Sequence, residues 1–418
     1  MRFEDMPADE LVYDWNLIDT RRPIATAGHV YLFDETLRDG IQSPSVVDPT
    51  IEDKLKILHL MDRLGIHSAD LGLPGAGPRA VEDLTRLVRE IADQKLSVLP
   101  GAAGRTHIND IKPIVEISQK VGMPIEVLAF LGSSPIRMYA EGWDMERMLK
   151  MTVDAIKLGV DNGLPVSFVT EDTVRSRPDT LKALFEAAIA AGATRLVLCD
   201  TCGHATPDGV RALCRFARSV IDGMGMRGEV SLDWHGHNDR GLALVNSIIA
   251  LENGVDRLHG TGLGIGERIG NTSMDQLLIN LRLLDVIDND VSALMEYCET
   301  IGRATGMGIP INYPLAGRDA FRTATGVHAA AIIKAENKGD DWLADQIYSG
   351  VPAGMIGRSQ QIEIGHMSGA SNTIYWLKKR DIEVSDALVE AIMARAKATN
   401  HTLTEDEVMA VVSDFRSS

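Results

Sequence analysis

Residues 165–199, PVSFVTEDTVRSRPDTLKALFEAAIAAGATRLVLC, contain one complete instance of the pattern that decides the fold. A short run rich in β-forming residues, PVSFV (165–169), precedes PDTLKALFEAAIAAGA (178–193), where apolar residues recur at i, i+3, i+4 and i+7. That period is typical of an amphipathic helix. A second β-rich run, RLVLC (195–199), follows. This order predicts two parallel strands joined by a helix that covers their sheet.

The same alternation continues along most of the chain. The candidate strands are residues 29–33, 68–73, 96–99, 125–130, 165–169, 195–199, 229–234 and 257–260. Eight such units within about 260 residues match a (β/α)₈ barrel. We therefore predict an α/β fold: a TIM barrel followed by a small, mostly helical C-terminal subdomain. A doubly wound open sheet is the alternative, but it usually has fewer strands and a glycine loop after the first strand.

Changes in composition along the chain suggest its organisation. Residues 1–28 are predicted to be an N-terminal arm and residues 29–295 the catalytic barrel. Gly- and Pro-rich sequence after the barrel indicates a linker, so residues 296–375 are assigned to a linker and C-terminal subdomain. Residues 376–418 have an amphipathic, mixed-charge pattern and are predicted to be a helical tail.

Composition excludes several classes of function. The chain has 418 residues with 42 Lys and Arg against 59 Asp and Glu, a formal net charge of −17, so no nucleic-acid partner is expected. No apolar run is long enough to span a membrane, and the acidic N-terminus does not resemble a targeting segment. Four cysteines in a chain of this length do not suggest a disulfide framework, which favours the cytoplasm. Cys199 and Cys202 form a CxxC without a second pair, and we interpret them as small filler residues.

Polar residues with ligand chemistry follow two predicted strands. The active site of a TIM barrel lies at the carboxyl ends of its strands. The first strand leads into DETLRDG (34–40), and the seventh ends in DWHGHND (233–239). Because residues i and i+2 of a strand point to the same side, His235 and His237 can face the barrel axis together. Two imidazoles and a carboxylate from across the barrel suit a divalent cation such as Mg²⁺, Mn²⁺, Zn²⁺ or Co²⁺; a surface pair of histidines is the alternative.

Three motifs in order carry a family resemblance. DETLRDGIQ (34–42), HGHND (235–239) and GLGIGERIGN (262–271) together resemble the DRE-TIM metallolyase superfamily. More narrowly, the sequence is similar to its Claisen-condensing branch, the 2-isopropylmalate, homocitrate and citramalate synthases. The glycines of the third motif are interpreted as letting backbone approach the substrate closely.

The resemblance implies roles for individual residues. The implied metal ligands are Asp39, His235, His237 and Asn271. The implied catalytic residues are Arg38, which would stabilise oxyanion charge, Glu171, for acid–base or orienting work, and His328, which would take a proton from the acetyl methyl group. The substrate-binding candidates from this source are Thr201, Arg175 and Gln42. Because His328 lies within residues 296–375, that subdomain would complete the active site; a structural role for His328 is the alternative, and Tyr348 has no secure assignment.

Departures from the family pattern suggest substrate preference. Arg137 stands where the branched-chain enzymes typically have histidine, and Asp70 where glutamate is usual. We hypothesise that Arg137, with help from Arg105, binds a second anionic group on the 2-oxo acid. The long C-terminal regulatory domain of the branched-chain enzymes has no counterpart here, so feedback through that module is not expected.

The expected function follows from the resemblance. It is a metal-dependent condensation of acetyl-CoA with a 2-oxo acid, giving a 2-alkylmalate and CoA, by a cytoplasmic homodimer without a nucleic-acid or membrane partner. One alternative is a retro-Claisen or aldol lyase, which is less favoured because residues 264–271 lack the cysteine that 3-hydroxy-3-methylglutaryl-CoA lyases carry there. The other alternative is a catalytically idle metal-binding homologue.

Overall fold

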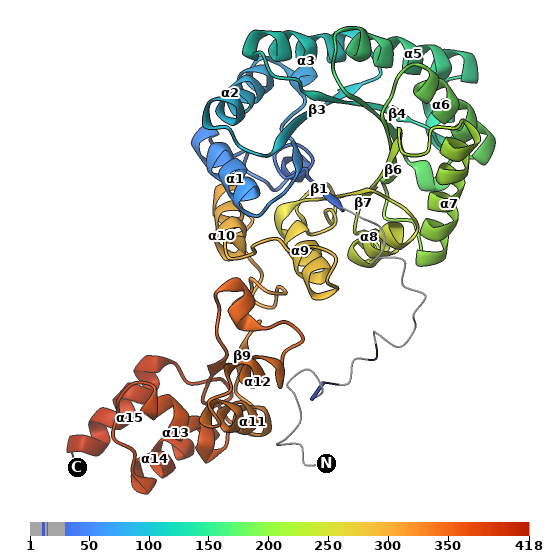
Figure 1. Ribbon diagram of the computed structural model, residues 1–418. Helices are drawn as coiled ribbons and strands as arrows, with labels where there is room; N and C mark the ends of the chain where they lie inside the picture. Colours follow the sequence, from blue (N-terminus) through green and yellow to red (C-terminus); the bar gives the residue numbers. More distant parts are fainter. Residues whose placement is uncertain (1–10, 13–14, 16–29, 418) are drawn as a thin grey trace. The chain divides into compact units, whose positions relative to one another are not determined.

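The computed structural model describes residues 11–12, 15 and 30–417. It separates into a barrel unit that extends to Gly308 and a C-terminal unit that begins at Ile309 (Figure 1). The predicted arm, residues 1–28, lies outside the described residues except for positions 11, 12 and 15.

The barrel unit is a closed sheet of eight parallel strands in sequence order, as predicted. The strands are β1 (Tyr31–Asp34), β2 (Ser68–Asp70), β3 (Leu99–Arg105), β4 (Glu126–Gly132), β5 (Val166–Glu171), β6 (Arg195–Asp200), β7 (Ser231–Gly236) and β8 (Arg257–Gly260). The barrel closes where β1 pairs with β8, with Tyr31 opposite Arg257. Figure 1 shows the helices arranged outside this ring.

One strand differs from its predicted position. The apolar run 96–99 predicted β3, but the strand is LPGAAGR, Leu99–Arg105. Small residues carry little β signal, yet the barrel interior requires them here. A Cβ on Gly101 would lie 3.2 Å from Cζ of Phe33, so glycine makes room for that buried ring.

Ten helices accompany the barrel strands among the described residues. They are α1 (Ile51–Arg63), α2 (Pro78–Gln94), α3 (Ile108–Val121), α4 (Pro135–Glu141), α5 (Met145–Asp161), α6 (Pro178–Ala190), α7 (Pro207–Gly223), α8 (Ala243–Glu252), α9 (Met274–Leu283) and α10 (Leu294–Ala304). α10 is tied to α1 by ion pairs, Arg63 to Glu296 at 2.7 Å and Arg303 to Asp53 at 3.0 Å. The barrel unit thus extends past residue 295, to Gly308.

The C-terminal unit is mostly helical. It contains α11 (Gly326–Asn337), α12 (Asp341–Gln346), α13 (Ala370–Lys378), α14 (Asp386–Lys397), α15 (Glu405–Ser417) and a parallel pair of two-residue strands, β9 (Arg322–Thr323) and β10 (Gln361–Ile362). Side chains of α13, α14 and α15 share one core, which includes Trp376, Leu388 and Val408. The tail helices therefore pack onto α13, and the predicted division at residue 375 falls within that helix.

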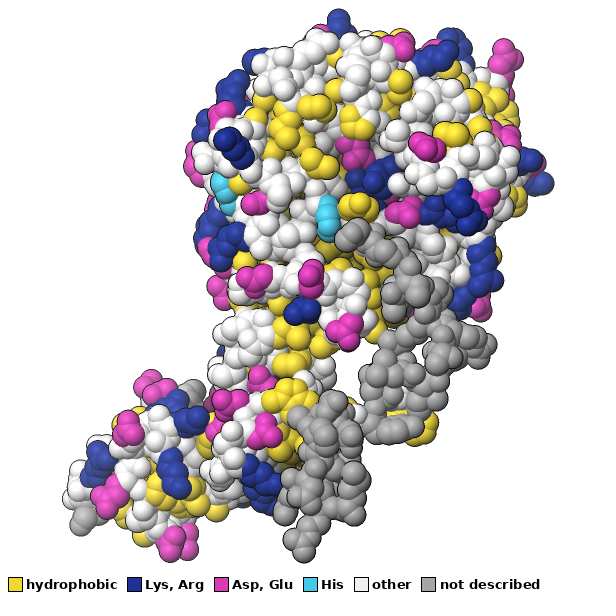
Figure 2. All heavy atoms as spheres, in the orientation of Figure 1, with side chains coloured by type: hydrophobic (Ala, Val, Ile, Leu, Met, Phe, Trp, Pro, Cys, Tyr) yellow, Lys and Arg dark blue, Asp and Glu magenta, His cyan; other side chains and the backbone are white. Residues whose placement is uncertain are grey.

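The distribution of charged side chains on the surface agrees with the acidic composition of the chain. Figure 2 shows Lys and Arg side chains interspersed with Asp and Glu on the face in view, without a continuous basic stripe there. Among the described residues, none of the helices has the length and apolar character needed to cross a membrane.

Candidate active site

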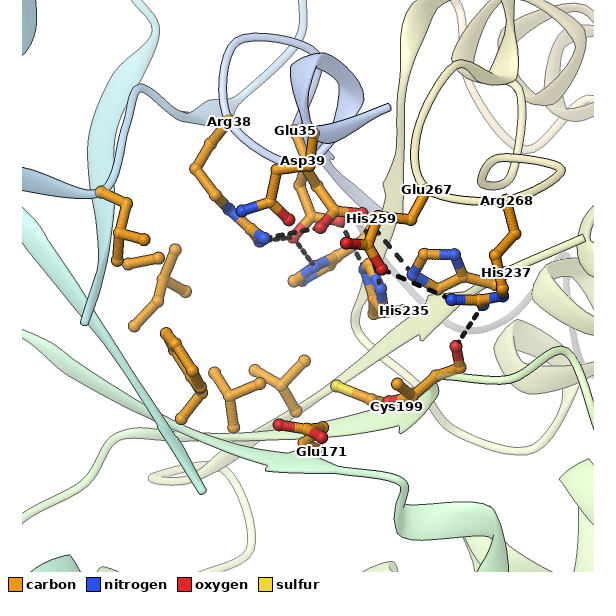
Figure 3. Close-up of a pocket in the computed structure, with 18 residues that line it drawn as sticks. Glu35, Arg38, Asp39, Glu171, Cys199, His235, His237, His259, Glu267 and Arg268 are labelled. Carbon is orange, nitrogen blue, oxygen red and sulfur yellow. Dashed lines mark hydrogen bonds and ion pairs between the residues drawn. The ribbon is translucent and has the colours of Figure 1, made fainter. Parts of the chain in front are cut away.

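A cavity of about 310 Å³ lies at the carboxyl ends of the barrel strands (Figure 3). Most of the predicted site residues of the barrel line it. Those residues are Arg38, Asp39, Gln42, Glu171, Thr201, His235 and His237. Parallel strands bring their carboxyl ends to one edge, so residues far apart in sequence meet here.

Asp39, His235 and His237 converge in this cavity. Their ligand atoms lie within 4.8 Å of one another, and all three residues are buried. Oδ2 of Asp39 is 3.6 Å from Nε2 of His237 and 4.0 Å from Nε2 of His235. Two ligand atoms that each lie about 2.1 Å from one cation are at most about 4.2 Å apart. The spacing between the carboxylate and each imidazole is therefore compatible with a shared ion.

Two buried oxygen atoms without hydrogen-bond partners support the same set of metal ligands. Oδ2 of Asp39 and Oδ1 of Asn271 are buried without a hydrogen-bond partner, which is costly unless something else satisfies them. A backbone bridge pairs Asn271 with His237, so the amide belongs to the same region. These donor types, two imidazole nitrogens and hard oxygen atoms, fit a divalent cation.

A second cluster, Glu35 with His235 and His259, also brings ligand atoms together, but its carboxylate is already occupied. Oε2 of Glu35 is 2.5 Å from Nδ1 of His235, and Oε1 accepts a hydrogen bond from Arg38 at 3.1 Å. A carboxylate that holds Nδ1 leaves Nε2 of the same ring available to a metal. Glu35 therefore orients His235. Sequence reasoning gave it no role, although it lies within DETLRDG.

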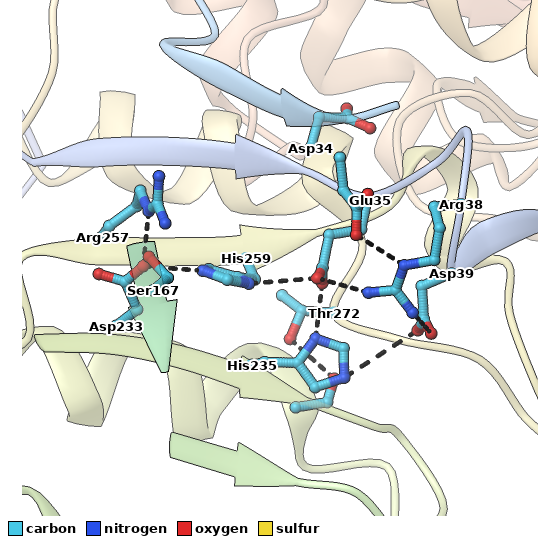
Figure 4. A network of polar contacts seen from close by, with 12 residues as sticks. Asp34, Glu35, Arg38, Asp39, Ser167, Asp233, His235, Arg257, His259 and Thr272 are labelled. Carbon is cyan, nitrogen blue, oxygen red and sulfur yellow. Dashed lines mark hydrogen bonds and ion pairs between the residues drawn. The ribbon is translucent and has the colours of Figure 1, made fainter. Parts of the chain in front are cut away.

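Arg38 is held by three carboxylates (Figure 4). It donates to Asp70 and Asp39 at 2.6 Å each, and to Glu35 at 3.1 Å. Burial by itself would raise the pKa of Asp39, but Arg38 and His235 lower it below the ordinary value. Asp39 is therefore anionic at neutral pH. Burial raises the pKa of Asp70 to about 6 despite Arg38.

A buried network of charged side chains adjoins the site (Figure 4). The sequence analysis did not predict it. His259 lies 3.3 Å from Glu35 and 3.1 Å from Asp233. Arg257 then bonds Asp233 at 2.6 Å and Glu126 at 2.6 Å. Burial would raise the pKa of Asp233, but Arg257 and Arg195 hold it well below its ordinary value. The available signal was Arg257 and His259 at i and i+2 in β8, which places both on one face of the strand.

The glycine-rich loop after β8 packs closely against itself, and its expected approach to the substrate stays a prediction. A Cβ on Gly266 would lie 2.2 Å from Nδ2 of Asn271, and one on Gly270 only 1.9 Å from the carbonyl oxygen of Gly264. All three glycines have positive φ, a region that favours glycine. They are required by the loop's contacts with itself, and this packing positions Asn271.

Thr201 and Glu171 also line this cavity. The hydroxyl of Thr201 accepts a hydrogen bond from the backbone N–H of Asp172 at 2.8 Å, so its own hydrogen is free to donate to a ligand. Burial raises the pKa of Glu171 although Arg137 opposes this effect. Nε of Arg137 lies 3.5 Å from Glu171, and Nη1 lies 3.2 Å from Glu141.

Three predicted binding arginines do not line this cavity. Arg137 forms ion pairs with Glu141 and Glu171, although its Nε is buried without a hydrogen-bond partner. Arg175 makes a bidentate pair with Asp172 at 2.7 Å for both contacts. Arg105 likewise pairs with Asp110 and its side chain is 67% exposed. Cys199 lines the cavity, and both it and Cys202 are free thiols, in agreement with the sequence interpretation.

His328 belongs to the C-terminal unit. It lies in the first turn of α11, is exposed, and stacks on Tyr348 with ring centroids 4.1 Å apart. The sequence gave Tyr348 no secure role, and this stacking is the contact that links it to His328. The proton-abstracting role of His328 stays a prediction.

Comparison with known proteins gives consistent matches. The HMGL-like family model matches residues 29–301. A probable 2-isopropylmalate synthase of Methanopyrus kandleri is 30% identical over 371 residues, 88% of this chain and 69% of the relative. The homocitrate synthase AksA of Methanothermobacter thermautotrophicus is 32% identical over 360 residues, 85% of each chain.

Solved structures match the barrel. The hydroxymethylglutaryl-CoA lyase of Pseudomonas aeruginosa aligns with a TM-score of 0.57 at 19% identity, covering 72% of this chain and 98% of the lyase. The HMG-CoA lyase of Bacillus subtilis aligns with a TM-score of 0.55 at 20% identity, covering 68% and 95%. At these identities the likeness shows a shared fold.

Proposed function

The chain belongs to the HMGL-like family and to its Claisen-condensing branch, and from this premise we propose that it condenses acetyl-CoA with a 2-oxo acid to give a 2-substituted malate and free CoA. It is an acyltransferase of the class that converts acyl groups into alkyl groups on transfer. The observation that supports the proposed reaction is the buried cluster of Asp39, His235 and His237 beside Arg38, with carboxylate and amide oxygens that lack partners.

Asp39, His235 and His237 would hold the divalent cation, with Oδ1 of Asn271 near them. When bound, this ion would act as a Lewis acid on the ketone of the 2-oxo acid. Glu35 fixes the ring of His235 from behind, so the ligand set is oriented before substrate arrives.

The other residues act on the substrates directly. A base takes a proton from the methyl group of acetyl-CoA, and the resulting carbanion attacks the ketone carbon. Arg38 offsets the negative charge that then develops on the ketone oxygen, and Thr201 donates to the substrate carboxylate. The alkoxide takes up a proton, and water cleaves the thioester to release CoA.

We assign two residues to the proton transfers of this reaction. Glu171 lines the cavity, and burial raises its pKa, which suits a carboxyl that exchanges a proton with the substrate. His328 is proposed as the base at the acetyl methyl group. Assembly as a homodimer is part of this proposal.

The test is CoA release from acetyl-CoA in the presence of Mn²⁺ and each of several 2-oxo acids, with the product identified by mass spectrometry. We expect release that depends on the 2-oxo acid and is lost when the protein is treated with a chelator. Acetyl-CoA formation from a 3-hydroxyacyl-CoA, without the condensation, would instead identify a lyase. Silence in both assays would refute catalysis.

A further inference from the structure

The cavity has one charged side and one apolar side, and the proposed reaction uses the residues of the charged side. The apolar wall consists of Leu73, Ala103, Leu128, Phe130, Val169 and Val197, which come from β3 to β6 and the loop after β2. Figure 3 shows these carbon-only side chains facing the labelled charged group across the cavity. Several of them form one cluster, with Ala103 and Leu128 buried and Phe130 and Val169 partly open.

The apolar wall has no cation to offer a second anionic group. Among the described residues, the Lys and Arg side chains that line the cavity are Arg38 and Arg268 alone. Arg38 lies on the charged side, where it is assigned to the ketone oxygen, and Arg268 bonds Asp239 at 2.7 Å and the carbonyl oxygen of Thr201 at 2.6 Å. The charged residue at the end of this wall is Glu171, which would repel an anion.

A bound 2-oxo acid is therefore expected to contact the charged side with its oxygen atoms and the apolar side with its carbon atoms. Its carboxylate and ketone oxygens match the charged side, so its remaining carbons meet the opposite wall. A second carboxylate placed there would lose its hydration without a partner, which is costly. An aliphatic chain placed there gains by leaving water.

We propose that the 2-oxo acid carries a short, uncharged aliphatic side chain, as 2-oxoisovalerate does, and that Leu128, Phe130 and Val169 determine this specificity. The inference rests on the proposed function and replaces the expected second anionic group. Arg137 then acts on Glu171, whose carboxylate it contacts, rather than on the substrate.

The first experiment compares matched 2-oxo acids on the wild-type protein with Mn²⁺ and acetyl-CoA. We expect kcat/KM for 2-oxoisovalerate to exceed that for 2-oxoglutarate by about a hundredfold or more, because a charged group lacks a partner on this wall. Without acetyl-CoA, 2-oxoisovalerate should also raise Tm more than 2-oxoglutarate does. Equal or better use of 2-oxoglutarate would overturn the inference while leaving the proposed function intact. CoA release with no 2-oxo acid at all would refute the function itself.

A pair of neighbouring substitutions tests the wall directly. Leu128→Ala enlarges the apolar side and should shift kcat/KM about tenfold toward 4-methyl-2-oxopentanoate over 2-oxobutanoate. Val127→Ala is the matched control, because Val127 is the adjacent residue in β4 and lies on the side of α5, near Gly159; it should leave the ratio unchanged. Val169→Ile adds a methyl group at a partly open position and should shift the ratio the other way, which keeps the test valid if Leu128→Ala does not fold. The same ratio in all variants would overturn the assignment.

Discussion

The two sides of the barrel mouth are built from the same βα unit, yet one side carries charged side chains and the other carries apolar ones. On the side of β7, β8 and β1, the inward positions carry charged groups, and Glu35, His235 and His259 contact one another. On the side of β3 to β6, the inward positions carry mostly aliphatic and aromatic groups. A charge is tolerated in a buried position when each neighbour pairs with it, and an apolar wall is tolerated because it needs no partner. In the proposed reaction, the charged side would polarise the ketone and the apolar side would select the side chain of the 2-oxo acid.

The largest expected effect is at the proposed metal ligands on the charged side. Asp39→Asn removes the anionic ligand and should lower kcat/KM about a thousandfold, because charge stabilisation at the reacting ketone is lost. Bound Mn²⁺, measured by atomic absorption after gel filtration, should fall in parallel. Asp208→Asn, at a side chain that is 94% exposed in α7, is the control. Unchanged metal content in Asp39→Asn would place the ion elsewhere.

The next effect concerns stability rather than catalysis. Arg257→Met leaves Glu126 buried without the arginine that pairs with it and leaves Asp233 with Arg195 as its remaining arginine, and should lower the free energy of unfolding by about 3–5 kcal/mol. Val197→Ala, on the apolar side, should cost only about 1–2 kcal/mol. Urea unfolding of both variants measures the difference. Similar losses for the two would show that the buried charges are not specially coupled.

A smaller effect is expected behind the ligands. Glu35→Gln keeps the shape of the side chain but removes the charge that holds His235, and should weaken Mn²⁺ binding about 10- to 100-fold. Calorimetric titration with Mn²⁺ gives the affinity without any substrate. If the affinity does not change, Glu35 does not orient the ligand.

The smallest effect is a pH dependence at the end of β1. Burial raises the pKa of Asp34 to about 6, although Thr36 and Tyr297 donate hydrogen bonds to it. Between pH of about 4 and 6 the folded chain therefore holds a proton that the unfolded chain has released, and stability falls as pH rises through that window. From pH 5 to pH 7 the wild type should lose about 1 kcal/mol more than Asp34→Asn does. Urea unfolding at both pH values checks this, and equal losses would contradict the raised pKa.

Much of the site could be predicted because its chemistry is local in sequence. Asp39 lies in the loop that follows β1. His235 is in β7, and His237 comes immediately after its last residue, Gly236, so the alternation of an extended backbone can bring the two rings to one face. The glycine loop was found by its pattern, but its internal contacts with Asn271 could not be derived from spacing. Arg175 looked available as an isolated cation, and only the structure shows that Asp172 pairs with it. Arg137 lies near Glu171, and its role in substrate binding stays a prediction.

The sequence by itself determined the repeating strand and helix order, the number of barrel strands and the residue types of the proposed metal site, because periodicity and motif are properties of neighbouring residues. The tertiary structure alone decided which charges are paired. The buried network from Glu35 through His259 and Asp233 to Arg257 joins residues of β7, β8 and the loop after β1, which are far apart in the sequence. It also decided that β3 is a glycine- and alanine-rich strand and that one wall of the cavity is apolar. These features depend on which side chains meet across a closed barrel, and closure is a property of all eight strands together.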